Sequence, residues 1–150
     1  MAFLSDNDRK EIREVFEQLH GDVKLVYFTE RESPLFIPGQ GCPTCKDTRM
    51  LLEEVKALSD KLNLEVHEFV ADSELAREHG IERIPALVIT SDTVKGKVRY
   101  FGMPSGYEFS VLLSSIVDAS QETAGLAEES IVALSGISTD VHIQVFVTPT

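Results

Sequence analysis

The spacing of apolar residues along the first two thirds of the chain predicts a regular series of helices and strands. Ser5–His20 is predicted to form an amphipathic helix, with a capping-box-like start made by Ser5 and Asp8. Val23–Phe28 is a short apolar run of β-branched and aromatic residues, which is typical of a buried strand. Thr29–Gly41 contains several prolines and glycines, so we expect a loop there.

The chain after this loop is predicted to form three more helices and three more strands. The helices are Pro43–Leu62, Ser73–His79 and Ser105–Gln121, and the strands are Leu64–Val70, Ala86–Thr90 and Lys97–Phe101. The polar residues between the last two strands predict a hairpin. This order of helices and strands favours an α/β fold with a central mixed sheet flanked by helices.

The C-terminal region repeats the beginning of this pattern. A linker is followed by a predicted helix over Glu128–Leu134 and a predicted strand over Val141–Val147. Asp22–Phe28 and Asp140–Phe146 share the pattern D-V-x-[LI]-x-[YV]-F, about one domain length apart. We therefore expect one complete unit over residues 1–121 and the start of a truncated second unit over residues 122–150. The alternative is a chance match between two strand-like segments.

Charge and length narrow the classes of function. The 150 residues carry 14 Lys and Arg against 25 Asp and Glu, a formal net charge of −11. This balance argues against binding to the nucleic-acid backbone, which needs clustered cations. No apolar run approaches the roughly 20 residues of a membrane span, and the N-terminus lacks the pattern of a signal peptide. The sequence therefore predicts a cytoplasmic protein that binds neither nucleic acid nor membrane.

The two cysteines of the chain, Cys42 and Cys45, form one C-x-x-C motif. The loop that they would close is too short to stabilise a fold appreciably. Cys42 is expected at the N-terminal edge of the predicted helix and Cys45 one turn along, with Pro43 in the first turn, where its missing N–H costs nothing. The helix dipole would favour a thiolate at Cys42, and Lys46 and Arg49 would add cationic support.

This arrangement predicts thiol–disulfide exchange in two steps. Cys42 attacks a disulfide of a partner and forms a mixed disulfide, and Cys45 then attacks Cys42 and releases the reduced partner. Pro43 and Thr44 carry no charge, so they would act on this chemistry mainly through geometry.

The motif has other uses in proteins. A zinc site needs two more ligands, but the four histidines, His20, His67, His79 and His142, are scattered singly, so no metal is predicted. A copper-carrying loop would have Met before the first cysteine, where this chain has Gln40 and Gly41. A cysteine pair without a chemical role is the remaining alternative. The apolar residues 35–37 of the preceding loop would either pack on the core or form a lip that contacts partners.

A strand, a C-x-x-C at a helix start, then a strand, a helix and Ile84-Pro85 before another strand resembles the thioredoxin superfamily. The resemblance implies a thioredoxin-like fold with a cis Pro85 facing the cysteines, and it implies that Ile84 offers its backbone to a bound partner. Pro43 and Thr44 would contact the same partner. The alternative for Pro85 is a proline that merely starts a strand.

Three features carry a closer resemblance to the two-unit, glutaredoxin-like protein disulfide oxidoreductases. They are Cys42-Pro43-Thr44-Cys45, the segment Phe101–Phe109, which is similar to F-G-x-P-x-G-x-E-F, and the second-unit start that ends in Val145–Thr150. A related two-unit arrangement occurs in the flavoenzyme that reduces a peroxidase. Glutathione-binding residues have no clear counterpart here, and Glu30 is the nearest candidate for the buried acid of thioredoxins.

Taken together, the sequence predicts a thiol–disulfide oxidoreductase acting on protein disulfides, with Cys42 as nucleophile, Cys45 as resolving thiol and Pro85 as cis-proline. No G-x-G-x-x-G motif is present, so no cofactor is predicted, and the resemblance implies a flavoprotein reductase as electron donor. The alternatives are a non-catalytic docking module and an electron-donor domain of a peroxidase system. The strand predicted over Val141–Val147 could pair within the chain or form a dimer.

Overall fold

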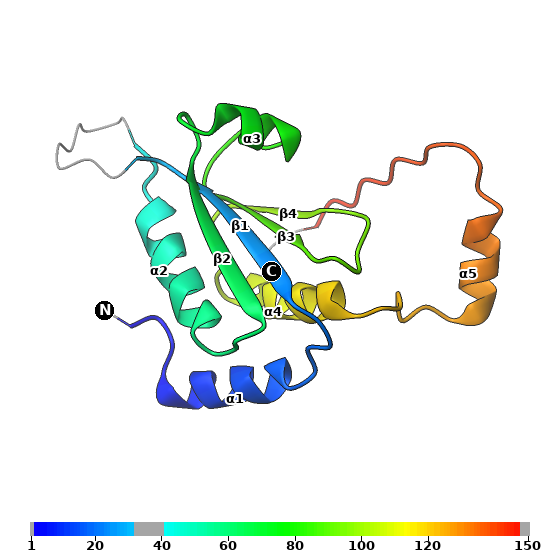
Figure 1. Cartoon of the computed structure of the whole chain (residues 1–150), viewed down its shortest axis with the longest axis horizontal. Coiled ribbons are helices and arrows are strands. Elements are labelled where there is room, and N and C mark those ends of the chain that lie inside the picture. Colours follow the sequence, from blue (N-terminus) through cyan, green and yellow to red (C-terminus); the bar gives the residue numbers. More distant parts are fainter. Residues whose placement is uncertain (1, 32–40, 148–150) are drawn as a thin grey trace.

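A four-stranded mixed sheet forms the centre of the computed structural model, which describes residues 2–31 and 41–147 (Figure 1). The strands lie in the order β2-β1-β3-β4. β1 (Val23–Thr29) pairs in parallel with β2 (Leu62–Glu68) and antiparallel with β3 (Ala86–Thr90), which pairs antiparallel with β4 (Val98–Phe101). The mixed sheet expected from the sequence is therefore confirmed, with β2 and β4 as its edges.

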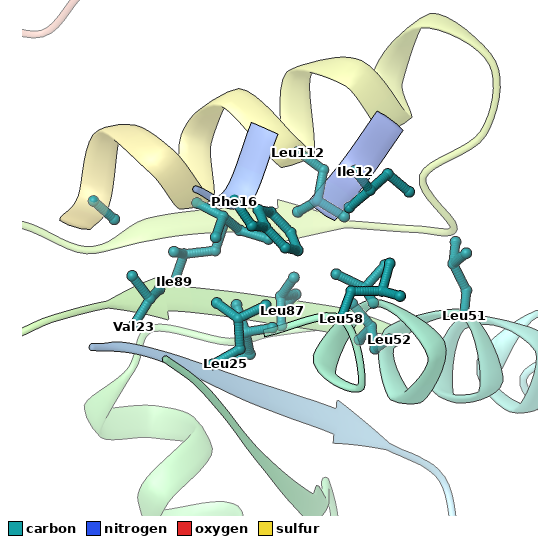
Figure 2. Packing of buried hydrophobic residues seen from close by; sticks show 14 of the residues in the cluster. Ile12, Phe16, Val23, Leu25, Leu51, Leu52, Leu58, Leu87, Ile89 and Leu112 are labelled. Carbon is teal, nitrogen blue, oxygen red and sulfur yellow. The ribbon is translucent and has the colours of Figure 1, made fainter. Parts of the chain in front are cut away.

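Helices cover both faces of this sheet because side chains of the central strands alternate between the two faces. On one face, Val23, Leu25 and Tyr27 of β1 pack with buried residues of α1 (Asp6–Phe16), α2 (Cys45–Lys56) and α4 (Tyr107–Ser120). Figure 2 shows this cluster between the helices and the sheet.

The other face is covered by α3 (Ser73–Glu78). Val26 and Phe28 of β1 pack there against Ala76 and Ile81. Because both of its faces are covered, β1 is buried along its length except at Lys24, which is exposed.

The N-terminal helix begins as the sequence predicts. Ser5 is the N-cap of α1, its Oγ accepts from the Asp8 N–H, and the Asp8 carboxylate accepts from the Ser5 N–H, which completes a capping box. The hydrogen bonds from Ser5 lower the pKa of Asp8. The helix ends at Phe16 rather than at His20, and Leu19 is buried from the turn that follows.

The helix predicted over Pro43–Leu62 is shorter than expected at both ends. α2 begins at Cys45, with Thr44 as its N-cap, so Pro43 precedes the helix instead of occupying its first turn. The helix ends at Lys56 because the chain then turns back and Leu62 enters β2, where it lies opposite Val23. The apolar spacing that suggested one long helix therefore combines a helix, a turn and the start of a strand.

The remaining elements of this unit differ from expectation by two residues or fewer at each end. β2 runs over Leu62–Glu68 rather than Leu64–Val70, and β4 begins at Val98. α3 ends at Glu78, and α4 covers Tyr107–Ser120. β3 occupies the predicted residues.

The C-terminal segment, residues 126–147, differs from the rest of the molecule. Its predicted helix is confirmed as α5 (Glu128–Ser135), although no residue of that helix is buried. The strand predicted over Val141–Val147 is wrong, because described residues 137–147 form neither helix nor strand. A strand needs another strand to take up its N–H and C=O groups, and no described strand of the sheet pairs with this segment.

Two expectations concern residues that the structure does not describe. The apolar residues 35–37 and the end of the second-unit start, residues 148–150, lie outside the described residues. Within the described ranges, no helix combines the length and the apolar character needed to cross a membrane.

Candidate functional site

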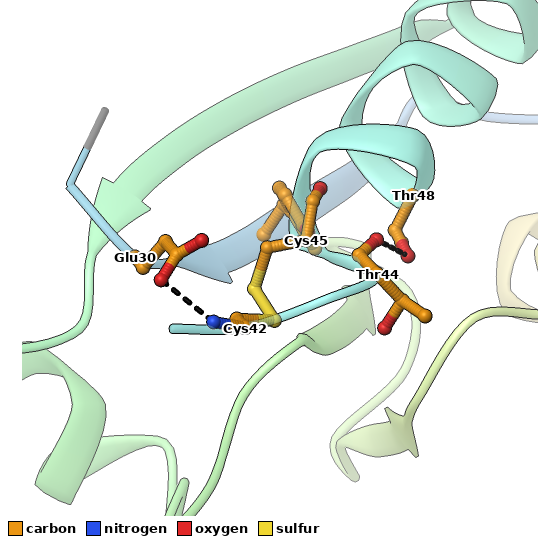
Figure 3. The surroundings of a disulfide bond; sticks show 6 residues. Glu30, Cys42, Thr44, Cys45 and Thr48 are labelled. Carbon is orange, nitrogen blue, oxygen red and sulfur yellow. Dashed lines mark hydrogen bonds between the residues drawn. A yellow bond between two sulfur atoms is a disulfide. The ribbon is translucent and has the colours of Figure 1, made fainter. Parts of the chain in front are cut away.

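Cys42 and Cys45 are joined by a disulfide at the start of α2 (Figure 3). Cys45 is the first residue of the helix, not a residue one turn along it, and Cys42 lies three residues before it. The Cys45 N–H donates to the Cys42 carbonyl at 3.4 Å. The cysteines therefore sit on a turn that leads into the helix, which explains how three residues of separation suffice for the bond.

The two cysteines differ in their access to solvent. Cys45 is 1% exposed, whereas Cys42 is half-buried. A thiolate on a partner or a partner disulfide can reach a sulfur only where that sulfur is accessible. The geometry therefore favours Cys42 as the residue that exchanges with partners and Cys45 as the internal thiol.

Tyr27 of β1 holds the first residue of the helix. Its hydroxyl is buried and donates to the Cys45 carbonyl at 2.7 Å. Burial raises the pKa of Tyr27, which keeps this hydroxyl protonated as a donor. Thr48 makes a second contact in the same turn, because its Oγ1 donates to the Thr44 carbonyl at 2.7 Å.

Glu30, directly after β1, holds the other cysteine. Its Oε2 accepts from the backbone N–H of Cys42 at 2.7 Å, as Figure 3 shows. Gly41 permits this approach, since it has φ +155° and a Cβ there would lie 3.3 Å from Glu30 Oε2. The sequence alone indicates Glu30 only as a candidate buried acid. The chain carries no local pattern that links it to the Cys42 backbone across the intervening loop.

Ile84 and Pro85 lie at the same end of the sheet. The Ile84–Pro85 peptide bond is cis, which confirms the expected conformation. Ala86, the next residue, pairs with Phe28 two residues before Glu30, so the register places Ile84 and Pro85 beside the strand end that leads to the cysteines. Pro85 is buried and its carbonyl accepts from the Gly102 N–H at 2.9 Å, while Ile84 is half-buried.

Pro43 and Thr44 differ in exposure within the motif. Pro43 is exposed, and Thr44 is half-buried at the helix cap. Of the expected cationic neighbours, Lys46 is exposed, and Arg49 donates from Nε to Glu53 at 2.8 Å, so its charge is matched within the helix. The cationic support expected from Arg49 is therefore reduced.

Metal ligands do not gather in the described ranges, where no group of three or more His, Cys, Asp or Glu side chains could hold an ion. His67 and His79 lie on the α3 side of the sheet, where their rings pack against Phe28. A surface hollow of about 500 Å³ also lies on that side, between Phe69, Ala76 and Ile81. Neither feature includes a residue of the cysteine site.

Solved structures similar to this chain include disulfide oxidoreductases. A protein disulfide oxidoreductase from Aeropyrum pernix K1 is 27% identical, with a TM-score of 0.73, covering 91% of this chain and 56% of its own. The alkylhydroperoxide reductase AhpF of Enterococcus faecalis is 19% identical, with a TM-score of 0.70, covering 85% and 57% respectively. The chain thus spans little more than half the length of either protein. No curated protein sequence matches it.

The fold of these structures is the thioredoxin-like fold that the sequence predicted, with a mixed sheet flanked by helices. A family model described as a thioredoxin domain matches residues 35–114, a range that includes Cys42, Cys45 and Pro85. Because this match covers more than half of the sequence, the chain belongs to the thioredoxin domain family.

Proposed function

We propose that this protein is a thiol–disulfide oxidoreductase that reduces disulfides of protein substrates through Cys42 and Cys45. The observation that carries the proposal is the Cys42–Cys45 disulfide itself, with one accessible and one buried cysteine in a thioredoxin-like fold. A disulfide this short in sequence contributes little to stability, so a role in exchange accounts for it better than a structural one.

The reaction balances in two exchange steps. In the dithiol form, the Cys42 thiolate attacks one sulfur of the substrate disulfide, whose S–S bond breaks and releases a thiolate. Cys45 then loses its proton and attacks Cys42 Sγ, which releases the second substrate thiolate. Two electrons have passed to the substrate, and the protein holds the Cys42–Cys45 disulfide of the structure.

The surroundings of the pair supply the remaining roles. Half-buried Ile84 beside the cysteine end of β1, exposed Pro43 and half-buried Thr44 would form the surface on which an extended substrate segment lies. The buried Pro85 would act behind this surface, by setting the course of the backbone at Ile84. Two electrons must return to the pair after each turnover, and a flavoprotein of the thioredoxin reductase type is the donor that we propose. A reducing, cytoplasmic setting suits such cycling.

The reduction of insulin disulfides by dithiothreitol tests the proposal. We expect the unaltered protein to accelerate the reaction and Cys42→Ser to return it to the uncatalysed rate, because the attacking sulfur is lost. Cys45→Ser should instead accumulate a mixed disulfide at Cys42, visible by intact mass. Circular dichroism checks the fold of both variants. Full activity in Cys42→Ser would contradict the assignment.

The likeness to the alkylhydroperoxide reductase AhpF supports a second candidate, an electron-donor unit that passes electrons to a peroxidase. The chemistry at the cysteines is the same, and only the acceptor differs. A third candidate is a non-catalytic module of the same fold that docks a protein partner. Inactivity of the unaltered protein toward both insulin and a peroxidase disulfide, with binding retained, would favour the docking module.

We further propose that residues 122–150 begin a second unit of the same fold. The D-V-x-[LI]-x-[YV]-F repeat supports this, as do the exposed apolar side chains of the C-terminal segment, which include Ile143 and Phe146. Pairing of this segment between two molecules is the competing proposal. Sedimentation of the chain distinguishes them, since a dimer that disappears on substituting Ile143→Asp would favour pairing between molecules.

A further inference from the structure

Glu30, the residue directly after β1, contacts the cysteine pair. Its carboxylate accepts a hydrogen bond of 2.7 Å from the backbone N–H of the half-buried cysteine of the pair. A hydrogen bond to a carboxylate is stronger than one between neutral groups. The contact joins residues 12 positions apart in sequence and therefore fixes where Cys42 lies relative to β1.

Cys45 is held from the same strand by a different contact. The Tyr27 hydroxyl donates to the Cys45 carbonyl. β1 and the residue after it therefore make a hydrogen bond to the backbone of each cysteine. The two contacts differ in charge, because Tyr27 offers a neutral donor while Glu30 brings a carboxylate to the cysteine that we propose as nucleophile. A substitution at Glu30 can therefore remove the charge and keep the hydrogen bond, whereas Tyr27 has no charge to remove.

The carboxylate has an electrostatic consequence when the disulfide is reduced. Like charges repel, so a Glu30 carboxylate that is hydrogen-bonded to the Cys42 backbone opposes a thiolate on the same residue. The charged side chains in the first turns of α2 do not offset this repulsion. Lys46 and Asp47 are both exposed and of opposite sign, and Arg49 is paired with Glu53.

We infer that Glu30 is a positioning residue of the redox site, which fixes Cys42 through its backbone N–H. Its negative charge also destabilises the dithiol form relative to the disulfide, and this makes the protein a stronger reductant. The importance of this effect for catalysis rests on the proposed function. The effect itself concerns only the equilibrium disulfide + 2e⁻ + 2H⁺ ⇌ dithiol, in which a destabilised thiolate disfavours the right-hand side.

Two substitutions at Glu30 separate the two roles. Glu30→Gln keeps an oxygen that accepts from the Cys42 N–H but removes the charge, whereas Glu30→Ala removes both. Gly41→Ala offers an independent route, since its Cβ would crowd Glu30 Oε2. Glu14→Gln makes the same chemical change on the exposed face of α1 and serves as the matched control.

The readouts are the equilibrium with a glutathione redox buffer and the pH dependence of alkylation of Cys42 by iodoacetamide, followed by mass spectrometry. For Glu30→Gln we expect the equilibrium constant to move about tenfold toward the dithiol, or about 30 mV, and the midpoint of alkylation to move to lower pH. Glu30→Ala should show this change and, in addition, slower insulin reduction. Gly41→Ala keeps the charge, so it should slow insulin reduction with little change in the equilibrium. Glu14→Gln should match the unaltered protein.

The inference is overturned if Glu30→Gln matches Glu14→Gln in both readouts, or if its equilibrium shifts toward the disulfide. Because both readouts follow the cysteines and not a substrate, they stand even if the protein fails to reduce insulin. Failure of the proposed function and failure of the role of Glu30 are therefore separate results.

Discussion

β1 and residues 140–146 carry nearly the same pattern of apolar residues, yet β1 is a buried strand and residues 140–146 are exposed. Phe28 is 0% exposed and Phe146, the equivalent residue, is 90% exposed. β1 has a strand on each side and helices on both faces, while residues 140–146 form no strand. The comparison teaches that this pattern specifies a capacity to pair, and that pairing itself needs neighbours for the backbone and for the side chains.

The largest expected effect comes from truncating the equivalent phenylalanines with the disulfide intact. Phe28→Ala should lower the free energy of unfolding by about 3–5 kcal/mol, since it empties a buried site, whereas Phe146→Ala should change it by less than about 0.5 kcal/mol. Urea denaturation measures both. Equal losses would show that the C-terminal segment packs against the unit in solution, and the two phenylalanines would then no longer differ.

A smaller effect is expected at Tyr27, the residue before Phe28 in β1. Tyr27→Phe removes the donor to the Cys45 carbonyl and should cost about 1–2 kcal/mol, because that carbonyl lies in a buried setting. Tyr107 is 87% exposed, so Tyr107→Phe is the control for the loss of a phenolic hydroxyl and should be neutral. No difference between the two variants would mean that the hydroxyl does not hold the start of α2.

The smallest expected effect is a pH dependence of stability that arises at His79, the residue that follows α3. His79 packs on Phe28, and burial, followed by the charge of Lys97, lowers its pKa from the ordinary 6.5. Between pH 6.5 and this lower pKa the unfolded chain binds more protons, so stability should fall as the pH drops from 7 through this window. Thermal unfolding at several pH values measures the slope.

His79→Gln should flatten that slope, while His142→Gln, in the exposed C-terminal segment, should leave it unchanged. An unaltered slope in His79→Gln would assign the pH dependence to other groups. Both variants are compared within the same window, so that titration of carboxylates at lower pH does not enter.

Much of the fold could be predicted because local physical rules govern it. The cap at Ser5 and the strand Ala86–Thr90 follow from side-chain chemistry within a few residues. The boundaries of α2 could not, since Leu62 fits a helical period equally well but is drawn into β2 beside Val23. Periodicity identifies residues that must be buried and does not say which element buries them.

The candidate site divides in the same way. The sequence by itself determined the C-x-x-C pair, the order of elements around it and the placement of Ile84-Pro85 before a strand, because each depends on neighbouring residues. Only the tertiary structure decided that Glu30 and Tyr27 hold the two cysteines and that the C-terminal segment stays unpaired. These outcomes depend on which distant groups come within hydrogen-bonding distance once the chain has folded, and no local pattern in the sequence encodes that distance.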